Sequence, residues 1–282
     1  MVFKKIKYFL TMIDFGHSLF VLPFAYLGAF LAARGVPDLY ALLWITVAMV
    51  SARTAALGLN RVIDRHIDAR NPRTANWVLP RGLISLWSVK AVIVLSLTVL
   101  LWAAYQLNSL CFKLAPLAVA VLVLYSYTKR FTWACHLWLG ASVAMGPVGG
   151  WLAITGQWDV AALLLGGAVA LWVAGFDIMY ACQDEEFDRQ EGIFSIPGRF
   201  GTRLALEIAA WFHTLTVLLL LAAGFYLKLH WPYYVGIAAA VLILRYEHRL
   251  VQPHDLSKMD TAAFKLNRYV SAIVFIFALL SF

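Results

Sequence analysis

Asn60, Asp64 and Asp68 follow one another at intervals of four residues at the end of an apolar segment. Positions i, i+4 and i+8 of a helix share one face, so these three side chains would point the same way. Two carboxylates on one face repel each other unless a cation lies between them, and Mg²⁺ commonly takes one or two carboxylates together with phosphate oxygens and water. The Asn60 carbonyl can add an oxygen, while Arg65 and Arg73 can bind phosphate directly. The motif therefore predicts a Mg²⁺ site that faces a phosphate-bearing ligand.

A second acidic motif repeats this spacing with Tyr180, Asp184 and Asp188, and Asp177 precedes it. Asp177 lies inside or at the edge of an apolar run, where an ionisable side chain is costly and usually functional. We expect Asp184 and Asp188 to hold a second Mg²⁺, and Tyr180 to hydrogen-bond phosphate or substrate. A charged helix whose side chains are solvated or paired along one face is the alternative for either motif alone. Two motifs in matched positions favour the metal site.

Two basic residues, Lys129 and Arg130, follow the apolar run that ends near Tyr127. Positive charge of this kind often does no more than anchor the end of a membrane helix. The functional alternative is that both side chains bind a diphosphate and stabilise it as it leaves.

The composition of the chain is that of a membrane protein. It has 282 residues, of which 62% are hydrophobic and only 13% charged, whereas a soluble domain has about 25% charged residues. The net charge of +8 does not indicate nucleic acid, because the charges lie between the apolar runs and not along one stripe. We therefore expect an all-α, polytopic protein whose surroundings are a lipid bilayer, with no nucleic acid partner.

The apolar runs predict about nine transmembrane helices in one domain that spans residues 1–282, with a polar cap on the cytoplasmic side. The predicted helices cover residues 16–34, 39–58, 86–106, 110–127, 134–154, 160–179, 204–227, 232–250 and 262–281.

The distribution of basic residues predicts the orientation in the membrane. If the N-terminus is cytoplasmic, only Arg34, Lys113 and Lys228 of the 23 Lys and Arg residues fall outside. Cytoplasmic loops are enriched in Lys and Arg, so we expect the N-terminus inside and the C-terminus outside. Both acidic motifs then lie on the cytoplasmic side, and we expect a multi-pass protein of a prokaryotic inner (plasma) membrane.

These motifs resemble those of the intramembrane aromatic prenyltransferases, the UbiA superfamily, over essentially the whole chain. Asn60–Asp68 together with Asn71–Thr74 is similar to the first aspartate-rich motif of the family, Asp177–Asp188 to the second, and Tyr127–Arg130 to the loop between helices 4 and 5. The region Phe176–Gly201 looks closest to the 4-hydroxybenzoate polyprenyltransferases, and the enzymes of the futalosine route to menaquinone look similar too.

The resemblance implies Mg²⁺-dependent transfer of a polyprenyl group from its diphosphate to an aromatic acceptor in quinone biosynthesis, with 4-hydroxybenzoate as the expected acceptor. Asp64, Asp68, Asp184 and Asp188 would hold the metal, and Asp177 or Tyr180 would position the acceptor. One position departs from the pattern, since Asp14 stands where the family usually has Lys or Arg. A basic side chain there would suit an anionic acceptor, so this departure leaves other UbiA-type acceptors open, including haem and chlorophyll precursors.

A cation or small-molecule transporter is the main alternative outside this class of enzyme. Transporters place ionisable side chains near the middle of the bilayer. The acidic residues of this chain gather at one membrane face beside basic residues, which favours the enzyme.

Overall fold

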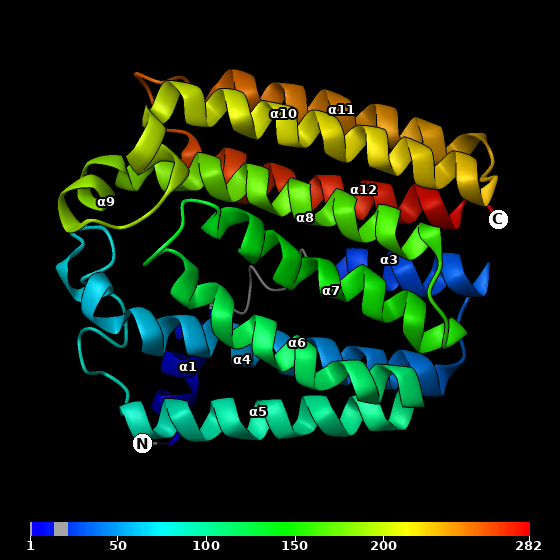
Figure 1. Cartoon of the computed structure of the whole chain (residues 1–282), viewed down its shortest axis with the longest axis horizontal. Helices are drawn as coiled ribbons and strands as arrows, with labels where there is room; N and C mark the ends of the chain where they lie inside the picture. Colours follow the sequence, from blue (N-terminus) through cyan, green and yellow to red (C-terminus); the bar gives the residue numbers. More distant parts are fainter. Residues whose placement is uncertain (1, 14–21) are drawn as a thin grey trace.

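The computed structural model describes residues 2–13 and 22–282, and these residues form a bundle of long helices that lie side by side (Figure 1). No β-strand occurs in these residues beyond an isolated bridge between Gln252 and Asp255. The elements are α1 (Val2–Met12), α3 (Leu22–Ala33), α4 (Leu39–Arg70), α5 (Leu86–Leu107), α6 (Ser109–Thr128), α7 (Cys135–Thr155), α8 (Val160–Ala181), the 3₁₀ turn η1 (Cys182–Asp184), α9 (Glu185–Glu191), α10 (Ile196–Leu227), α11 (Trp231–Leu250), the π-helical segment η2 (Thr261–Leu266) and α12 (Asn267–Leu279).

Seven helical segments of the described chain are long and apolar enough to cross a membrane. The all-α membrane class is therefore confirmed, while the number nine stays a prediction. Within the described residues α3 is shorter, with 12 residues, and α11 ends in a charged stretch that includes Arg245, Glu247 and Arg249. The seven segments are Leu39–Arg70, Leu86–Leu107, Ser109–Thr128, Cys135–Thr155, Val160–Glu191, Ile196–Leu227 and Thr261–Leu279.

Helix α4 runs without a break through the first acidic motif, twelve residues beyond the predicted end at residue 58. Asp38 caps its start, where the carboxylate accepts a hydrogen bond from the Ala41 N–H at 2.9 Å. The helix ends at Arg70 because Asn71 precedes Pro72, and a residue before proline is disfavoured in the helical region. The first motif therefore has the regular helical spacing that the sequence predicts.

The second acidic motif does not lie on one regular helix, and this corrects the prediction. Helix α8 ends at Ala181, η1 follows over Cys182–Asp184, and α9 begins at Glu185. Asp184 has φ −107° and ψ 6°, in the sparsely populated region between helix and strand where many active-site residues lie. The break turns Asp184 and Asp188 away from the direction that an unbroken helix would give them.

Helix α10 begins at Ile196, well before the predicted start at residue 204, and contains a kink at Gly201. Gly201 has φ 81° and ψ 157°, a conformation that is open almost only to glycine. Glu185 stabilises the restart of the helix, since its carboxylate accepts hydrogen bonds from the Thr202 N–H at 2.8 Å and the Thr202 hydroxyl at 2.6 Å. The kink brings the first turn of α10 against α9.

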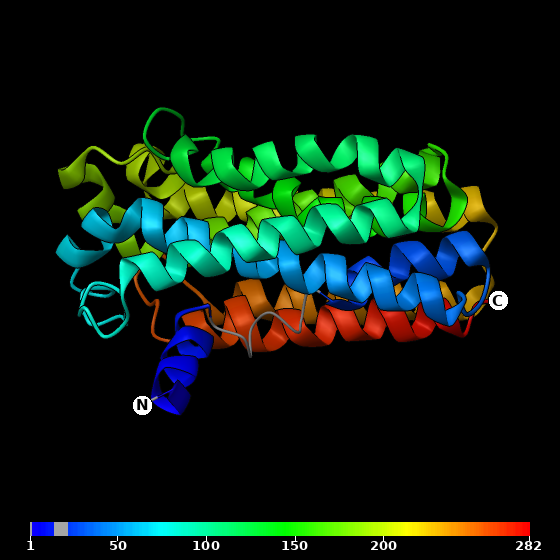
Figure 2. The ribbon, with the colours of Figure 1, turned by 90° about the horizontal axis from the view of Figure 1, so that it is seen from below.

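The largest buried cluster surrounds α8, whose Trp172 is fully buried between residues of α3, α7, α10, α11 and α12. Helix α9 and the loop of residues 71–85 lie at the same end of the bundle as α1, and the C-terminus lies at the other end (Figures 1 and 2). This arrangement agrees with the prediction that both acidic motifs and the N-terminus share one side. The identity of that side as cytoplasmic stays a prediction.

Candidate active site

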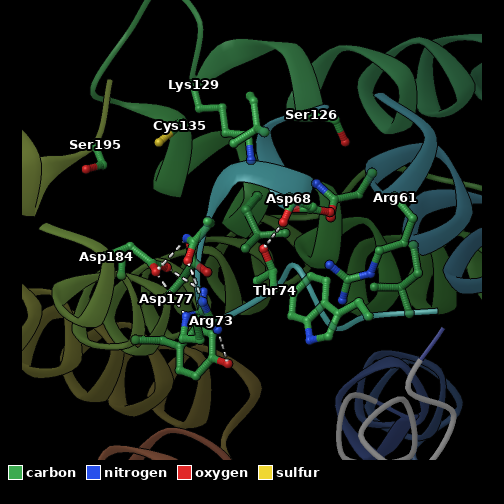
Figure 3. A pocket seen from close by; sticks show the side chains of 18 of the residues that line it. Arg61, Asp68, Arg73, Thr74, Ser126, Lys129, Cys135, Asp177, Asp184 and Ser195 are labelled. Atoms are coloured by element: carbon green, nitrogen blue, oxygen red, sulfur yellow. Dashed lines mark hydrogen bonds and ion pairs between the residues drawn. The ribbon is translucent and has the colours of Figure 1, made fainter. Parts of the chain in front are cut away.

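A cavity of about 800 Å³ opens among the described residues at the end of the bundle that carries both acidic motifs. Its walls come from α4, the loop of residues 71–85, the last turn of α6, α7, α8, α9 and η2. Figure 3 shows Asp68, Lys129, Asp184 and Arg73 around this space. Elements far apart in the sequence therefore meet at one charged site.

Arg73 holds the Asp184 carboxylate with both arms of its guanidinium group. Its Nε donates to Asp184 Oδ1 at 3.0 Å and an Nη donates to Oδ2, while the other Nη donates to the Tyr180 hydroxyl at 2.6 Å. Asn71 adds a third hydrogen bond to Asp184, from its Nδ2 to Oδ1 at 2.9 Å. The loop after α4 therefore fixes the orientation of an acidic residue that lies after α8.

Burial of Arg73 acts to lower its pKa, but the hydrogen bonds and the charge of Asp184 outweigh burial and raise the pKa above its usual range. The guanidinium group consequently remains charged beside the cavity.

Asp64 is the most buried carboxylate of the first motif, with 1% of the residue exposed. Its Oδ2 accepts from Asn60 Nδ2 at 2.7 Å and lies 2.7 Å from Lys129 Nζ, and Oδ1 lies 3.0 Å from an Nη of Arg130. The end of α6 thereby supplies two cations to one carboxylate on α4. This contact explains how α4 can bury a charged side chain.

One carboxylate oxygen in the first motif, Asp68 Oδ2, is buried without a hydrogen-bond partner in the described structure, whereas Asp64 Oδ1 has the Arg130 guanidinium group 3.0 Å away. Buried polar atoms usually have partners, and a hard cation such as Mg²⁺ binds oxygen ligands. In the described part of the chain, no three His, Cys, Asp or Glu side chains are close enough to form a metal site by themselves. Asp68 Oδ2 thus fits a metal that also takes ligands from substrate phosphates and water.

Asp177 faces the same cavity from α8 and is hydrogen-bonded to a buried histidine. His136 Nδ1 lies 2.7 Å from Asp177 Oδ2, and the Ile196 N–H donates to His136 Nε2 at 3.3 Å. The Asp177 side chain is 28% exposed, against 4% for His136. Asp177 is therefore accessible from the cavity, and the histidine lies behind it.

The deeper walls of the cavity are apolar and aromatic. Leu139 and Val143 come from α7, and Val173 and Phe176 come from α8. Phe264 packs against Tyr180 with their ring centroids 4.9 Å apart and the planes at 69°. The charged end of the cavity therefore continues into a region suited to hydrocarbon.

Asn267 supports the segment that carries Phe264. Its side-chain oxygen accepts from Trp172 Nε1 at 2.5 Å, and its two N–H donors are shared among Glu247 Oε2 at 3.1 Å, the Ala262 carbonyl at 3.1 Å and the Ala263 carbonyl at 3.3 Å. π-Helical turns leave carbonyl groups unpaired and are frequent at functional sites. The Asn267 amide pairs two such carbonyls of η2 and so holds one wall of the cavity.

The described residues that line the cavity carry equal numbers of formal charges of each sign. The acidic ones are Asp68, Asp177, Asp184, Asp188 and Asp260, and the basic ones are Arg53, Arg61, Arg73, Lys129 and Lys265. A ligand that carries only positive or only negative charge would leave the cavity with a net charge. An anion that binds together with cations would keep the net charge near zero.

Most of the residues singled out from the sequence line this cavity, and three do not. Asp64 and Arg130 lie behind the wall, paired with each other, although Asp64 also contacts Lys129. Arg65 is not brought to the site, because its guanidinium group donates to the Val62 carbonyl of its own helix at 3.2 Å. The residues that do line the cavity are Asn60, Asp68, Arg73, Lys129, Asp177, Tyr180, Asp184 and Asp188.

Several lining residues had no role in the sequence analysis. His136 begins an apolar helix, and its partner Asp177 is 41 positions away, so no local spacing relates the two. Arg53 lies two turns before Asn60 on α4, where its place in an apolar run was the only available signal. Asp14, where the chain departs from the family pattern, lies outside the described residues.

The model of the UbiA prenyltransferase family matches residues 21–269 of the chain. Among curated relatives, a 4-hydroxybenzoate octaprenyltransferase of Aliivibrio fischeri is 30% identical over 247 residues, covering 88% of this chain and 86% of the relative. Another 4-hydroxybenzoate octaprenyltransferase, of Alcanivorax borkumensis, is 32% identical over 250 residues, covering 87% and 84%.

Solved structures with the same fold include a UbiA homologue from Aeropyrum pernix K1, which is 31% identical with a TM-score of 0.86 and covers 94% of this chain and 98% of its own. A UbiA homologue from Archaeoglobus fulgidus, bound to GPP and Mg²⁺, is 20% identical with a TM-score of 0.69 and covers 95% and 99%. The second likeness supports the fold alone.

Proposed function

Because the chain belongs to the UbiA prenyltransferase family, we propose that it transfers a polyprenyl group from its diphosphate to 4-hydroxybenzoate with Mg²⁺ as cofactor. The names of relatives at 30% and 32% identity support this acceptor, and the buried Asp68 Oδ2, which has no hydrogen-bond partner among the described residues, fits the metal. The reaction would take place in a prokaryotic inner membrane, with both acidic motifs at the cytoplasmic face.

The observation that carries the proposal is one cavity with a charged end and an apolar interior. A polyprenyl diphosphate has the same division, with a multiply charged head and a long hydrocarbon tail. A transporter would need ionisable side chains near the middle of the bilayer. The acidic groups that line this cavity come from Asp68 on α4, from residues 177–188 and from Asp260 just before η2, toward the end of the bundle.

The charged end would bind the diphosphate. Asp68, Asp184 and Asp188, which line the cavity, would hold Mg²⁺, which when bound would neutralise phosphate charge and stabilise the leaving group. Lys129 and Arg73 reach the cavity with charged groups that bind phosphate oxygens. The Lys129 and Arg73 side chains would thus hold the diphosphate in place as negative charge develops on its departing oxygen.

The apolar interior would protect the reacting carbon. The bond between the allylic carbon and the diphosphate oxygen breaks, and its electron pair stays with the diphosphate. Phe176, Phe264 and Tyr180 present aromatic rings to the cavity, and an aromatic face stabilises a nearby cation by about 0.5–2 kcal/mol. The ring carbon of the acceptor then forms the new carbon–carbon bond, and loss of the proton from that carbon restores aromaticity.

The acceptor would lie between Arg53 and Asp177. Arg53 lines the cavity two turns deeper on α4 than Asn60, where its charge can pair with a carboxylate. Asp177 can accept a hydrogen bond from the phenolic hydroxyl and increase electron density in the ring. Arg53 thus offers a cation for an anionic acceptor although Asp14 replaces the usual basic residue.

The proposal can be tested with detergent-purified protein, Mg²⁺, a polyprenyl diphosphate and 4-hydroxybenzoate, with prenylated product detected by mass spectrometry. We expect product that disappears with EDTA and returns with excess Mg²⁺. Arg53→Met should raise KM for 4-hydroxybenzoate by tenfold or more and leave KM for the diphosphate unchanged, because a pair of this kind contributes about 1.4 kcal/mol or more.

A different outcome is product only with another quinone precursor, such as one of the futalosine route, or with a haem or chlorophyll precursor. That result would support prenyl transfer and show that 4-hydroxybenzoate is not the acceptor. If folded protein uses no prenyl diphosphate with any of these acceptors, the prenyl-transfer proposal fails and transport becomes the better explanation.

A further inference from the structure

His136 is a buried polar side chain at the start of α7, and both of its ring nitrogens have partners. Backbone N–H groups only donate hydrogen bonds, so the bond from the Ile196 N–H requires a lone pair on His136 Nε2. The ring proton is therefore on Nδ1, and this N–H donates to Asp177 Oδ2 at 2.7 Å. These two contacts set both the tautomer and the orientation of the ring.

The same two contacts set the orientation of Asp177. With Oδ2 held from behind by a buried ring, Oδ1 is the oxygen left for a ligand in the cavity. Hydrogen bonds that orient a functional side chain reduce the rearrangement needed when the ligand binds. A carboxylate without this contact would rotate among several directions.

We propose that His136 is a positioning residue, which holds the carboxylate of Asp177 so that one oxygen faces the hydroxyl group of the aromatic acceptor. The inference rests on the proposed function. His136 acts through Asp177 and does not reach the reacting atoms, because its side chain is 4% exposed and both nitrogens are engaged.

The contact with Ile196 has a separate, structural effect. Ile196 begins α10, and the first N–H groups of a helix have no partner within the helix. His136 Nε2 accepts one of them, while the Ser195 hydroxyl accepts the Gly198 N–H at 3.1 Å. A test of positioning must therefore separate the loss of the Asp177 contact from the loss of this helix-start contact.

Two substitutions separate them. His136→Leu removes both contacts, whereas His136→Asn also leaves Ile196 without its acceptor but keeps an amide N–H near the place of Nδ1. Both variants should have similarly lowered Tm values in detergent. We expect H136L to lower kcat/KM for 4-hydroxybenzoate by about 10–100-fold, with KM for the diphosphate changed less than twofold, and H136N to recover most of the loss.

A double-mutant cycle with Asp177→Asn shows whether His136 acts through this carboxylate. We expect H136L combined with D177N to be no slower than D177N alone, since residues that act as one unit have non-additive effects. His213→Leu is the matched control, because His213 is also buried and hydrogen-bonded, to His248 at 2.9 Å, but does not line the cavity. It should lower Tm and leave both KM values unchanged.

Three results would overturn the inference while the wild-type enzyme still makes product: equal losses in H136L and H136N, wild-type kinetics in H136L, or multiplied losses in the double mutant. Should H136L not fold, His136→Ala replaces it, because it also lacks the donor and adds no bulk. A wild-type protein that transfers no prenyl group would reject the proposed function instead, so the two failures are distinguishable.

Discussion

Substitution of Arg73 by lysine keeps the positive charge and removes the planar, forked shape of the guanidinium group. Arg73 makes two hydrogen bonds to Asp184 and one to the Tyr180 hydroxyl. A lysine ammonium group is a compact charge on a flexible chain and cannot reproduce a bidentate contact. The variant therefore isolates the geometric contribution of Arg73 from its electrostatic one.

The size of the effect follows from the number of bonds that lysine cannot make. If one bond to Asp184 survives, the variant loses one bond to a carboxylate and one to a neutral hydroxyl. These are worth about 1.5 and 1 kcal/mol, with the lower end used because 28% of the Arg73 side chain is exposed. The sum of about 2.5 kcal/mol corresponds to roughly 70-fold in rate if all of it is expressed in the transition state.

The assay is single-turnover transfer from a polyprenyl diphosphate at saturating Mg²⁺, in matched amounts of folded protein. We expect R73K to transfer the prenyl group 10–100-fold more slowly than wild type. Tyr180→Phe loses only the hydrogen bond from Arg73 to the neutral Tyr180 hydroxyl, and should be about fivefold slower. Arg65→Lys is the control, because Arg65 bonds to its own helix outside the cavity, and it should match wild type. Wild-type rates in R73K would refute the reasoning, as would equal losses in R73K and R65K.

Three further predictions concern other parts of the site. Lys129→Met removes the ammonium group 2.7 Å from Asp64 and should lower the transfer rate by tenfold or more. The yield of protein in the membrane should fall less than the transfer rate. If yield and transfer rate fall equally, Lys129 only anchors the helix end. Gly201→Ala should lower the free energy of unfolding by about 1–3 kcal/mol, because φ 81° and ψ 157° strain any residue with a side chain. Thermal unfolding in detergent measures this change. Gly149→Ala is the control and should leave stability unchanged, because the added methyl group meets no atom within 4 Å. Asn267→Leu should lower stability by about 2 kcal/mol, from one accepted and two donated membrane hydrogen bonds at about 0.6 kcal/mol each. An unaltered unfolding curve would show that the network contributes nothing.

The features that the sequence predicted well depend on local periodicity. Asn60, Asp64 and Asp68 have the predicted common face because nothing between Leu39 and Arg70 interrupts the helix. The apolar runs identified the long helices for the same reason, since a helix is the simplest way to pair backbone groups in lipid. Predictions of this kind need no knowledge of the rest of the fold.

The features that it missed depend on tertiary contacts. The break before Glu185 and the early start of α10 occur together, because the Glu185 carboxylate binds Thr202 just after the Gly201 kink. The composition of either segment alone is that of an ordinary helix. Asp64 was expected at the ligand, and it lies behind the wall because the end of α6 folds over it. The contact between His136 and Asp177 likewise exists only once α7 and α8 pack together.

The ion pairs of the site link its assembly to its chemistry. Asp184, after α8, is held by Arg73 from the loop after α4, and Asp64, on α4, is held by Lys129 from the end of α6. A carboxylate as buried as Asp64 would destabilise the fold by several kcal/mol without a cation beside it. The cations that allow these carboxylates to be buried are therefore the same ones that face the cavity, where a diphosphate would bind. Each pair joins segments distant in the sequence, so the acidic motifs become a site only when the bundle has closed.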